Sequence, residues 1–257
     1  MLRRLDRSVI LLALLALTVL SWLWLISSGR GMSEKDAASM PGMTMPMPMP
    51  SPWTAARFGL TFAMWWVMMI GMMLPGAAPM ILMFATVNRN KRASGQDFVP
   101  VSAFALGYLL VWGLFSAGAT VTQWALDQLA MLSASLRMIS PTVGALLLIA
   151  AGIYQFTPLK QACLRHCRSP LAFVLNHWHD GRAGALRVGM EHGTLCLGCC
   201  WVLMALLFVA GVMNLLMAAA IAAFVLVEKL LPGGVWIGRL GGATMIAVGA
   251  WLAAGGA

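Results

Sequence analysis

The stretch LCLGCCWVLMALLFVAGVMNLLMAAAIAAFVLVEKLL, residues 195–231, is an apolar block of 37 residues whose only charged members are Glu228 and Lys229. A straight helix of that length would extend roughly 55 Å, whereas the hydrocarbon core of a bilayer is about 30 Å thick. Gly211 and Asn214 are the helix-weakening residues near its middle. The block therefore predicts two membrane-spanning helices joined by a tight turn, with a single tilted helix or a re-entrant hairpin as the alternatives.

The rest of the chain has the same apolar character. Of its 257 residues, 61% are hydrophobic and 10% are charged, and this composition is too apolar for an ordinary soluble domain. Apolar runs recur, and each is long enough to cross a bilayer. We expect an all-α, polytopic transmembrane bundle of about seven helices. The predicted segments run approximately over residues 8–26, 58–84, 99–122, 139–156, 193–212, 214–231 and 235–254.

The distribution of basic residues predicts a cytoplasmic N-terminus. With that orientation, thirteen Lys and Arg residues, Lys160 and Lys229 among them, lie on the cytoplasmic side and four lie on the other side. This asymmetry is typical of inner-membrane proteins. It also accounts for the net charge of +9, so we expect no nucleic-acid partner. The predicted location is the bacterial cytoplasmic (inner) membrane, with the lipid bilayer as a partner.

Three parts follow from this topology. Residues 1–27 form an N-terminal transmembrane anchor, and residues 28–57 form a Met/Pro-rich extracytoplasmic linker. Residues 58–257 form a helical membrane domain with a cytoplasmic Cys/His loop at 157–192. The first segment has the basic start and apolar run of a signal peptide, but no A-x-A-like site follows, which favours an uncleaved anchor.

All five cysteines and all four histidines lie between residues 163 and 200. They include two triples, C-x-x-H-C at Cys163, His166 and Cys167, and C-x-x-C-C at Cys196, Cys199 and Cys200. The spacing i, i+3, i+4 puts each triple on one face of a helix. A reducing cytoplasm disfavours disulfides, and thiolates with imidazoles suit Cu(I), Zn(II) or an iron–sulfur cluster. We predict a metal site; buried packing cysteines and thiol redox chemistry are the alternatives.

Three further residues bear on this site. His192 precedes Cys196 by four residues, so it is the best additional ligand if the helix begins early enough to include it. Glu228 is a candidate hard ligand or proton acceptor beside the thiolates, because ionisable groups in membrane segments usually have a task. The alternative for Glu228 is a local ion pair with Lys229. His177 and His179 are two residues apart and more typical of a loop.

Methionine is abundant, with 21 copies, and it is concentrated in two places. Residues 40–49, MPGMTMPMPM, alternate Met with Pro, so they predict an extended exterior segment whose thioethers capture Cu(I). A linker without a role in binding is the alternative. The second predicted helix carries five methionines at steps of four, and this spacing is similar to the M-x-x-x-M ladders of copper uptake channels. They are Met64, Met68 and Met72, and Met69 and Met73.

Core packing is the alternative for this Met ladder, since Met commonly fills irregular gaps. Pro75 and Pro79 follow the ladder. We expect them to kink or interrupt the helix, because proline lacks the N–H donor of the backbone.

Four stretches, in order along residues 58–232, carry these features. They are MWWVMMIGMMLPGAAPM (64–80), YQFTPLKQACLRHCRSP (154–170), HGTLCLGCCW (192–201) and GVMNLLMAAAIAAFVLVEKLLP (211–232). Together they resemble an uncharacterised bacterial family of predicted metal-binding integral membrane proteins that contain a domain of unknown function. The resemblance implies a helical membrane protein that binds metal. One departure is that such members tend to carry Trp near Leu216 and Met217.

The family motifs correspond to particular positions of this chain. The resemblance implies roles for the five cysteines, for the five ladder methionines, and for an N-x-L…EK element at Asn214, Glu228 and Lys229. It implies no reaction.

The functional hypothesis is an integral membrane protein that handles Cu(I), by capture, transfer or passive transport through Met and Cys/His ligands. Zinc or another soft metal is the alternative ion. Neither a P-loop nor a D-K-T-G-type phosphorylation motif is present in the sequence. The alternative function is a membrane redox enzyme or accessory subunit with a Cys-ligated metal cofactor, although the pattern favours binding over catalysis. A periplasmic metallochaperone or a membrane subunit is the expected protein partner.

Overall fold

The computed structural model describes residues 2–37, 52–93, 99–129, 131–132 and 140–255. Within these ranges every regular element is a helix, which confirms the all-α class. The nine helices are α1 (Leu2–Ala37), α2 (Ala55–Ala93), α3 (Val101–Gln128), α4 (Pro141–Tyr154), α5 (Pro158–Arg168), α6 (Pro170–Asn176), α7 (Gly181–Ala210), α8 (Leu215–Leu230) and α9 (Gly234–Ala253).

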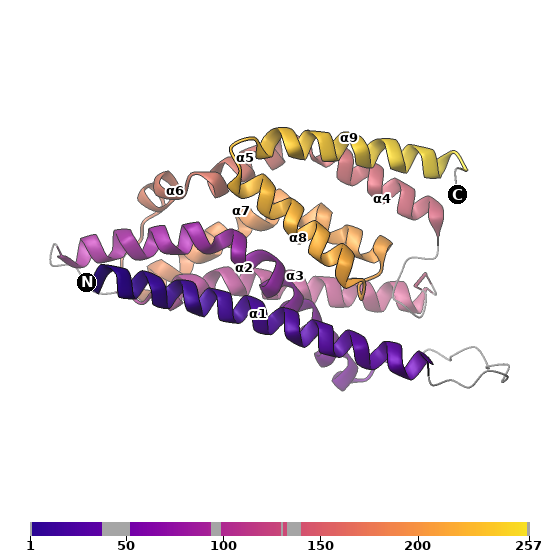
Figure 1. Ribbon diagram of the computed structural model, residues 1–257, viewed down its shortest axis with the longest axis horizontal. Coiled ribbons are helices and arrows are strands. Elements are labelled where there is room, and N and C mark those ends of the chain that lie inside the picture. Colours follow the sequence, from indigo (N-terminus) through magenta and orange to yellow (C-terminus); the bar gives the residue numbers. More distant parts are fainter. Residues whose placement is uncertain (1, 38–51, 94–98, 130, 133–139, 256–257) are drawn as a thin grey trace.

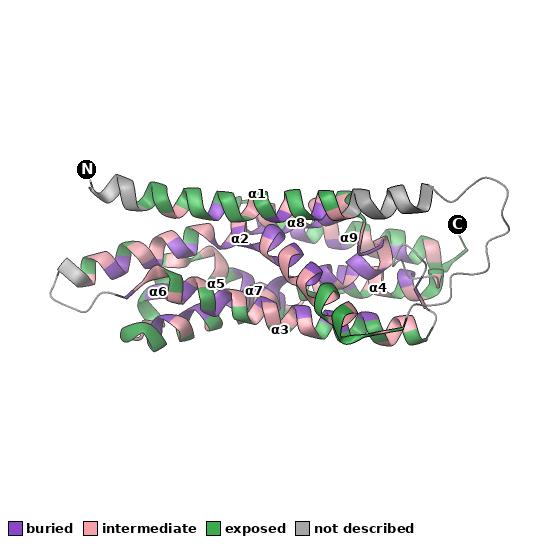
Figure 2. Cartoon of the chain, turned by 90° about the horizontal axis from the view of Figure 1, so that it is seen from below, coloured by how far each residue is buried: buried purple, intermediate pink, exposed green. Residues whose placement is uncertain are grey.

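The helices form an elongated bundle in which most axes follow the long dimension of the molecule (Figure 1). α3 packs along α7, α4 packs along α9, and α2 lies against α1, α3 and α8. Buried residues concentrate on α2 and α7, whereas most of residues 7–28 of α1 are exposed (Figure 2). The interior of the bundle is therefore built around α2 and α7, the helices that carry the Met ladder and the C-x-x-C-C triple.

The apolar block 195–231 forms two helices, α7 and α8, as predicted. The turn begins at Gly211, whose φ of 96° is a conformation that glycine adopts at little cost. Asn214 then caps α8, because its side chain accepts a hydrogen bond from the Met217 backbone N–H at 3.2 Å. The two residues chosen from the sequence as helix-weakening are thus the ones that turn the chain.

The region 157–192, which we predicted to be a loop, is mostly helical. It contains α5, α6 and the first turns of α7, which begins at Gly181 rather than near 193. Thr157 caps α5 by accepting from the Lys160 N–H at 3.3 Å, and Pro158 occupies the first helical position. This correction accounts for the helices beyond the seven expected.

We predicted that the prolines of α2 would either kink or interrupt the helix, and they do not interrupt it. α2 continues through Pro75 and Pro79, and its course bends along its length (Figure 1). Because Pro75 has no N–H, the Gly71 carbonyl loses its usual helical donor. The indole Nε1 of Trp22 in α1 donates to that carbonyl at 3.3 Å. The proline therefore creates a hydrogen-bonding site that joins α1 to α2.

Within the described residues, α1, α2, α3, α7 and α9 are long and apolar enough to cross a bilayer. The pair α4 and α5, bent by 61°, adds a sixth crossing if it counts as one broken span. α8 has 16 residues and is shorter than these helices. Large apolar side chains are exposed on the outer helices, among them Leu12 at 63% and Trp236 at 68%. These surfaces are compatible with contact to lipid.

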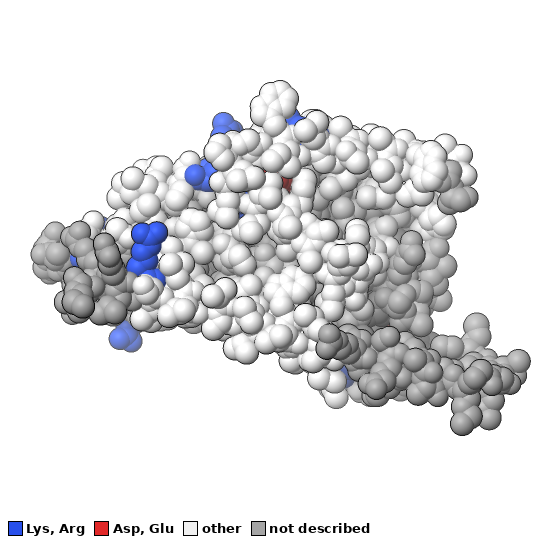
Figure 3. Space-filling model, in the orientation of Figure 1, with Lys and Arg blue, Asp and Glu red and all other residues white. Residues whose placement is uncertain are grey.

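On the face seen in Figure 3, Lys and Arg gather toward the end where α1 begins. The alternating directions of the helices put the end of α2, with Lys91, and the start of α7, with Arg182, at the same end as the start of α1. Two of the basic residues that we assigned to cytoplasmic segments are instead buried: Lys160 is 1% exposed and Lys229 is 6% exposed. Both have partners in the core, as described below.

Candidate metal centre

The closest helix contact in the site region is between α3 and α7. A Cβ placed on Gly189 of α7 would collide with the backbone carbonyl of Phe104 in α3, so only glycine permits this approach. The contact brings Tyr108 to α7, where its hydroxyl lies 3.2 Å from the Cys196 Sγ. The same hydroxyl donates to the Met73 carbonyl of α2 at 3.1 Å. Three helices therefore meet at Cys196.

The C-x-x-C-C triple lies on a buried face of α7. Cys196, Cys199 and Cys200 are each at most 2% exposed. The Cys199 and Cys200 thiols both donate to the Cys196 carbonyl, each at 3.0 Å. The Cys200 Sγ also lies 3.9 Å from the Met73 Sδ. The structure thus brings the triple together with one methionine of the ladder.

The two cysteines of the C-x-x-H-C triple in α5 face α7, whereas its histidine faces away from the site. Cys167 is half-buried, packs against the core and lies near Cys199. Cys163 packs against Gly198 of α7, where a Cβ would come within 2.8 Å of its Sγ. His166 is exposed, and its Nδ1 lies 2.9 Å from the Ala162 carbonyl of its own helix. The structure brings Cys167 to the α7 thiols and leaves His166 outside.

His192 is buried in an aromatic environment one turn before Cys196. It is 2% exposed, and its ring stacks on those of Tyr108 and Phe104 at centroid distances of 5.5 and 6.0 Å. α7 includes both His192 and Cys196, which is the condition set by the sequence argument. Neither ring nitrogen of His192 has a hydrogen-bond partner among the described residues. A buried polar group without a partner is unusual, so this imidazole retains its full capacity as a ligand.

The Met ladder of α2 is part of the core. Its five members, Met64, Met68, Met69, Met72 and Met73, are between 0 and 8% exposed. In the described part of the chain, Met73 is the ladder residue with a recorded contact to a thiol. The second methionine-rich feature, residues 40–49, lies outside the described residues.

The partners of Glu228 and Lys229 differ from both sequence expectations. Each carboxylate oxygen of Glu228 lies 2.8 Å from the Lys160 Nζ, which also donates to the Gln155 side chain. The Lys229 Nζ donates to the Cys196 Sγ at 2.9 Å. Successive residues of a helix point about 100° apart, so the two side chains reach different elements. The local Glu228–Lys229 pair is therefore wrong, and the carboxylate is engaged by Lys160 rather than by a thiol.

Sequence reasoning missed Lys160 and Tyr108, and although the family resemblance implied a role for Lys229, it did not indicate a contact with Cys196. The lysines were read as loop charges because nothing local distinguishes a buried lysine from a loop lysine. One signal was available: Lys229 lies inside the apolar block 195–231, where an ionisable residue calls for a partner.

Arg168 fixes α5 against the end of α8. Its guanidinium donates to the Glu228 carbonyl at 3.1 Å, to that of Leu231 at 2.7 Å and to that of Pro232 at 2.9 Å. The last carbonyls of a helix have no intrahelical donor, and a cation there also complements the helix dipole. This contact holds Cys167 and Lys229, on two different helices, at the same centre.

The sequence of residues 62–252 matches a family described as "PpoB2: Copper chaperone". The match spans more than half of the chain. The chain belongs to this copper chaperone family. No curated protein and no solved structure matches the chain. The matched range contains every predicted ligand except the methionines of residues 40–49, and the expectation of a metal-related family is confirmed at this level.

The thiol sulfurs of the candidate centre do not converge on one point. Among the described residues, no group of three or more His, Cys, Asp or Glu side chains is positioned to hold a metal ion. The reason is visible in the rotamers, because Cys199 and Cys200 both point back to the Cys196 carbonyl. Rotation about χ1 would free both sulfurs, so coordination requires a change of rotamer.

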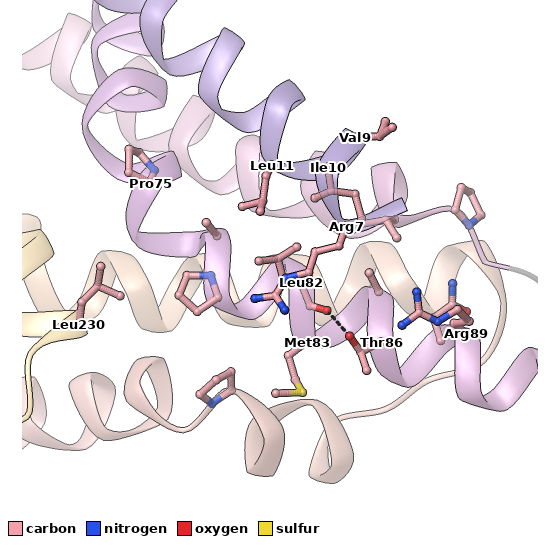
Figure 4. A pocket seen from close by; sticks show the side chains of 17 residues that line it. Arg7, Val9, Ile10, Leu11, Pro75, Leu82, Met83, Thr86, Arg89 and Leu230 are labelled. Atoms are coloured by element: carbon pink, nitrogen blue, oxygen red, sulfur yellow. Dashed lines mark hydrogen bonds between the residues drawn. The ribbon is translucent and has the colours of Figure 1, made fainter. Parts of the chain in front are cut away.

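A cavity of about 1210 Å³ lies apart from the thiols, mainly between α1 and α2. Figure 4 shows the Arg7 side chain reaching from α1 toward α2, where Leu82 and Arg89 also line the space. None of the predicted ligands is among its lining residues. The candidate centre is therefore part of the packed core and separate from this cavity.

Proposed function

We propose that the chain is an integral membrane copper chaperone that holds Cu(I) at a thiol cluster, defined as the buried Cys196, Cys199 and Cys200 with the half-buried Cys167. The observation that carries this proposal is the buried α7 triple, which has Cys167 of α5 beside it and the Met73 Sδ 3.9 Å from the Cys200 Sγ. Thiolate and thioether sulfurs are the soft ligands that Cu(I) prefers. Membership of the copper chaperone family supports copper as the ion.

His192 is the further ligand in this proposal. Its unpartnered nitrogens and its place one turn from Cys196 support the assignment. Glu228 is not included, because Lys160 engages both of its oxygens.

In this proposal the helices cross the cytoplasmic membrane, with the basic end of the bundle in the cytoplasm. The length and apolarity of α1, α2, α3, α7 and α9 support the crossing, and the Lys/Arg asymmetry supports the orientation. Copper would then pass from residues 40–49 along the α2 methionines to the thiols. Thiolates are stronger ligands than thioethers for Cu(I), so the last transfer, from the methionines to the thiols, is favourable.

Copper binding by the purified full-length protein tests the thiol cluster. We expect stoichiometric Cu(I) under anaerobic conditions, and loss of most of that copper when Cys196, Cys199 and Cys200 are changed to Ser. Cys163→Ser is the matched control, since this thiol packs on Gly198 and should leave copper binding unchanged. Full copper stoichiometry in the triple variant would remove the thiol cluster from the proposal.

Deletion of residues 40–49 tests the capture step separately. We expect lower copper loading in cells at limiting external copper, because the exterior thioethers are gone. Copper stoichiometry of the purified deletion variant should equal that of the wild type. Unchanged loading in cells would exclude the capture role and leave the thiol cluster unaffected.

A further inference from the structure

The described core carries one buried lysine that no carboxylate offsets. Lys229 is 6% exposed, and its recorded partner is the Cys196 sulfur at 2.9 Å. The other buried cation, Lys160, is matched by Glu228, which is the buried carboxylate among the described residues. No ion pair between Lys229 and a carboxylate occurs among the described residues. The thiol cluster therefore lies beside an unmatched positive charge.

The position of this ammonium is determined by several helices. The Lys229 side chain runs past Gly76 of α2, where a Cβ would lie 3.3 Å from its Cδ. Arg168 holds the end of α8, and Tyr108 lies on the same sulfur as Lys229. A buried ammonium is costly unless it meets negative charge. A neutral side chain would avoid that cost, so the charge itself calls for an explanation.

The charge of a bound copper complex explains why a buried ammonium is present beside the thiols. Cu(I) held by two thiolates has a net charge of −1, whereas Zn(II) held by two thiolates has a net charge of zero. With the ammonium of Lys229 beside it, the copper complex sums to zero and the zinc complex sums to +1. In a medium of low dielectric, the neutral assembly is strongly favoured.

Resting on the proposed function, we infer that Lys229 is the counter-cation of a two-thiolate Cu(I) complex in which Cys196 is one ligand. It acts as a specificity-determining residue, because it favours a monovalent soft cation, Cu(I) or Ag(I), over a divalent one. Lys229 does not itself bind the metal; its charge offsets the anionic complex from the position it has beside Cys196.

The affinities for Cu(I) and for Zn(II), measured on the same variants, test this inference. The full-length protein in detergent is titrated with Cu(I) against a chromophoric Cu(I) chelator, and with Zn(II) against a zinc indicator. For Lys229→Gln we expect Cu(I) affinity to fall by about tenfold or more, because the complex becomes a buried anion. Zn(II) affinity should hold or rise, because the zinc complex becomes neutral.

Two control variants distinguish the effect of the Lys229 charge from a general disruption of the site. Lys229→Arg keeps the charge and should retain Cu(I) affinity within about threefold. Lys91→Gln removes one positive charge from the partly exposed end of α2 and should change neither affinity, because this charge is in contact with water and is screened. If the glutamine variant does not fold, Lys229→Leu provides a second neutral side chain.

The outcomes are distinct. Equal weakening of Cu(I) and Zn(II) in Lys229→Gln, or unchanged Cu(I) affinity, overturns the counter-cation. Loss of Cu(I) in Lys229→Arg as large as in Lys229→Gln overturns it as well. A wild-type protein that binds no Cu(I) contradicts the proposed function instead, whereas copper binding that depends on Cys196 but not on Lys229 contradicts only this inference.

Discussion

The two buried lysines of this protein have different partners. The Lys160 ammonium meets both oxygens of Glu228 at 2.8 Å and the side chain of Gln155. The Lys229 ammonium meets the Cys196 sulfur at 2.9 Å, and it forms no ion pair with a carboxylate in the part of the chain that the structure describes. Glu228 and Lys229 are adjacent in α8, so one turn of helix provides the anion of one pair and the cation of the other. The first pair is complete in itself, whereas the second has a sulfur partner that can also bind a soft metal.

Packing around the two pairs reinforces the difference. A Cβ on Gly238 of α9 would collide with the Glu228 carboxylate, so α9 closes over the Lys160–Glu228 pair. Arg168 binds the carbonyl of the same glutamate. Around Lys229 the neighbours include the α7 thiols and the Tyr108 phenol, and thiols can change rotamer and bind a metal. We interpret the first pair as structural and the second as part of the copper site.

Breaking the structural pair should give the largest change in stability. Glu228→Gln leaves the Lys160 ammonium buried without an anion, so we expect the free energy of unfolding to fall by about 3–5 kcal/mol. Unfolding in detergent, followed by circular dichroism, measures this loss.

The double variant Lys160→Leu with Glu228→Leu is the matched control for that loss. Replacing both charges by apolar groups removes the unpaired ion, so stability should return to within about 1–2 kcal/mol of the wild type. If the single and double variants are equally destabilised, then the ion pair is not what the single change breaks.

Local features of the sequence were sufficient for the fold class and for part of the site. Apolar composition predicted helices, and Gly211 and Asn214 predicted the turn, because backbone freedom and capping act within a few residues. The i, i+3, i+4 spacing put Cys196 and its neighbours on one buried face.

Features that depend on tertiary contacts were not predictable in the same way. The partner of Glu228 is 68 residues away in sequence, and the Tyr108–Cys196 contact joins residues 88 apart. Spacing alone put His166 with Cys167, but α7 covers only part of the α5 surface and His166 lies outside it. The helices α5 and α6 within 157–192 were missed because helices of 11 and 7 residues lack the long apolar runs that reveal a membrane segment.

The smallest expected effect concerns the thioether beside the thiol cluster. Met73 lies 3.9 Å from the Cys200 sulfur, whereas Met64, about two and a half turns earlier in α2, packs in the core. Met73→Leu removes a weak soft ligand while conserving volume, so we expect Cu(I) affinity to fall by about threefold, under 1 kcal/mol. Met64→Leu is the matched control, with no change in affinity. Competition with a Cu(I) chelator measures both, and equal losses in the two variants would assign the ladder to packing rather than to copper.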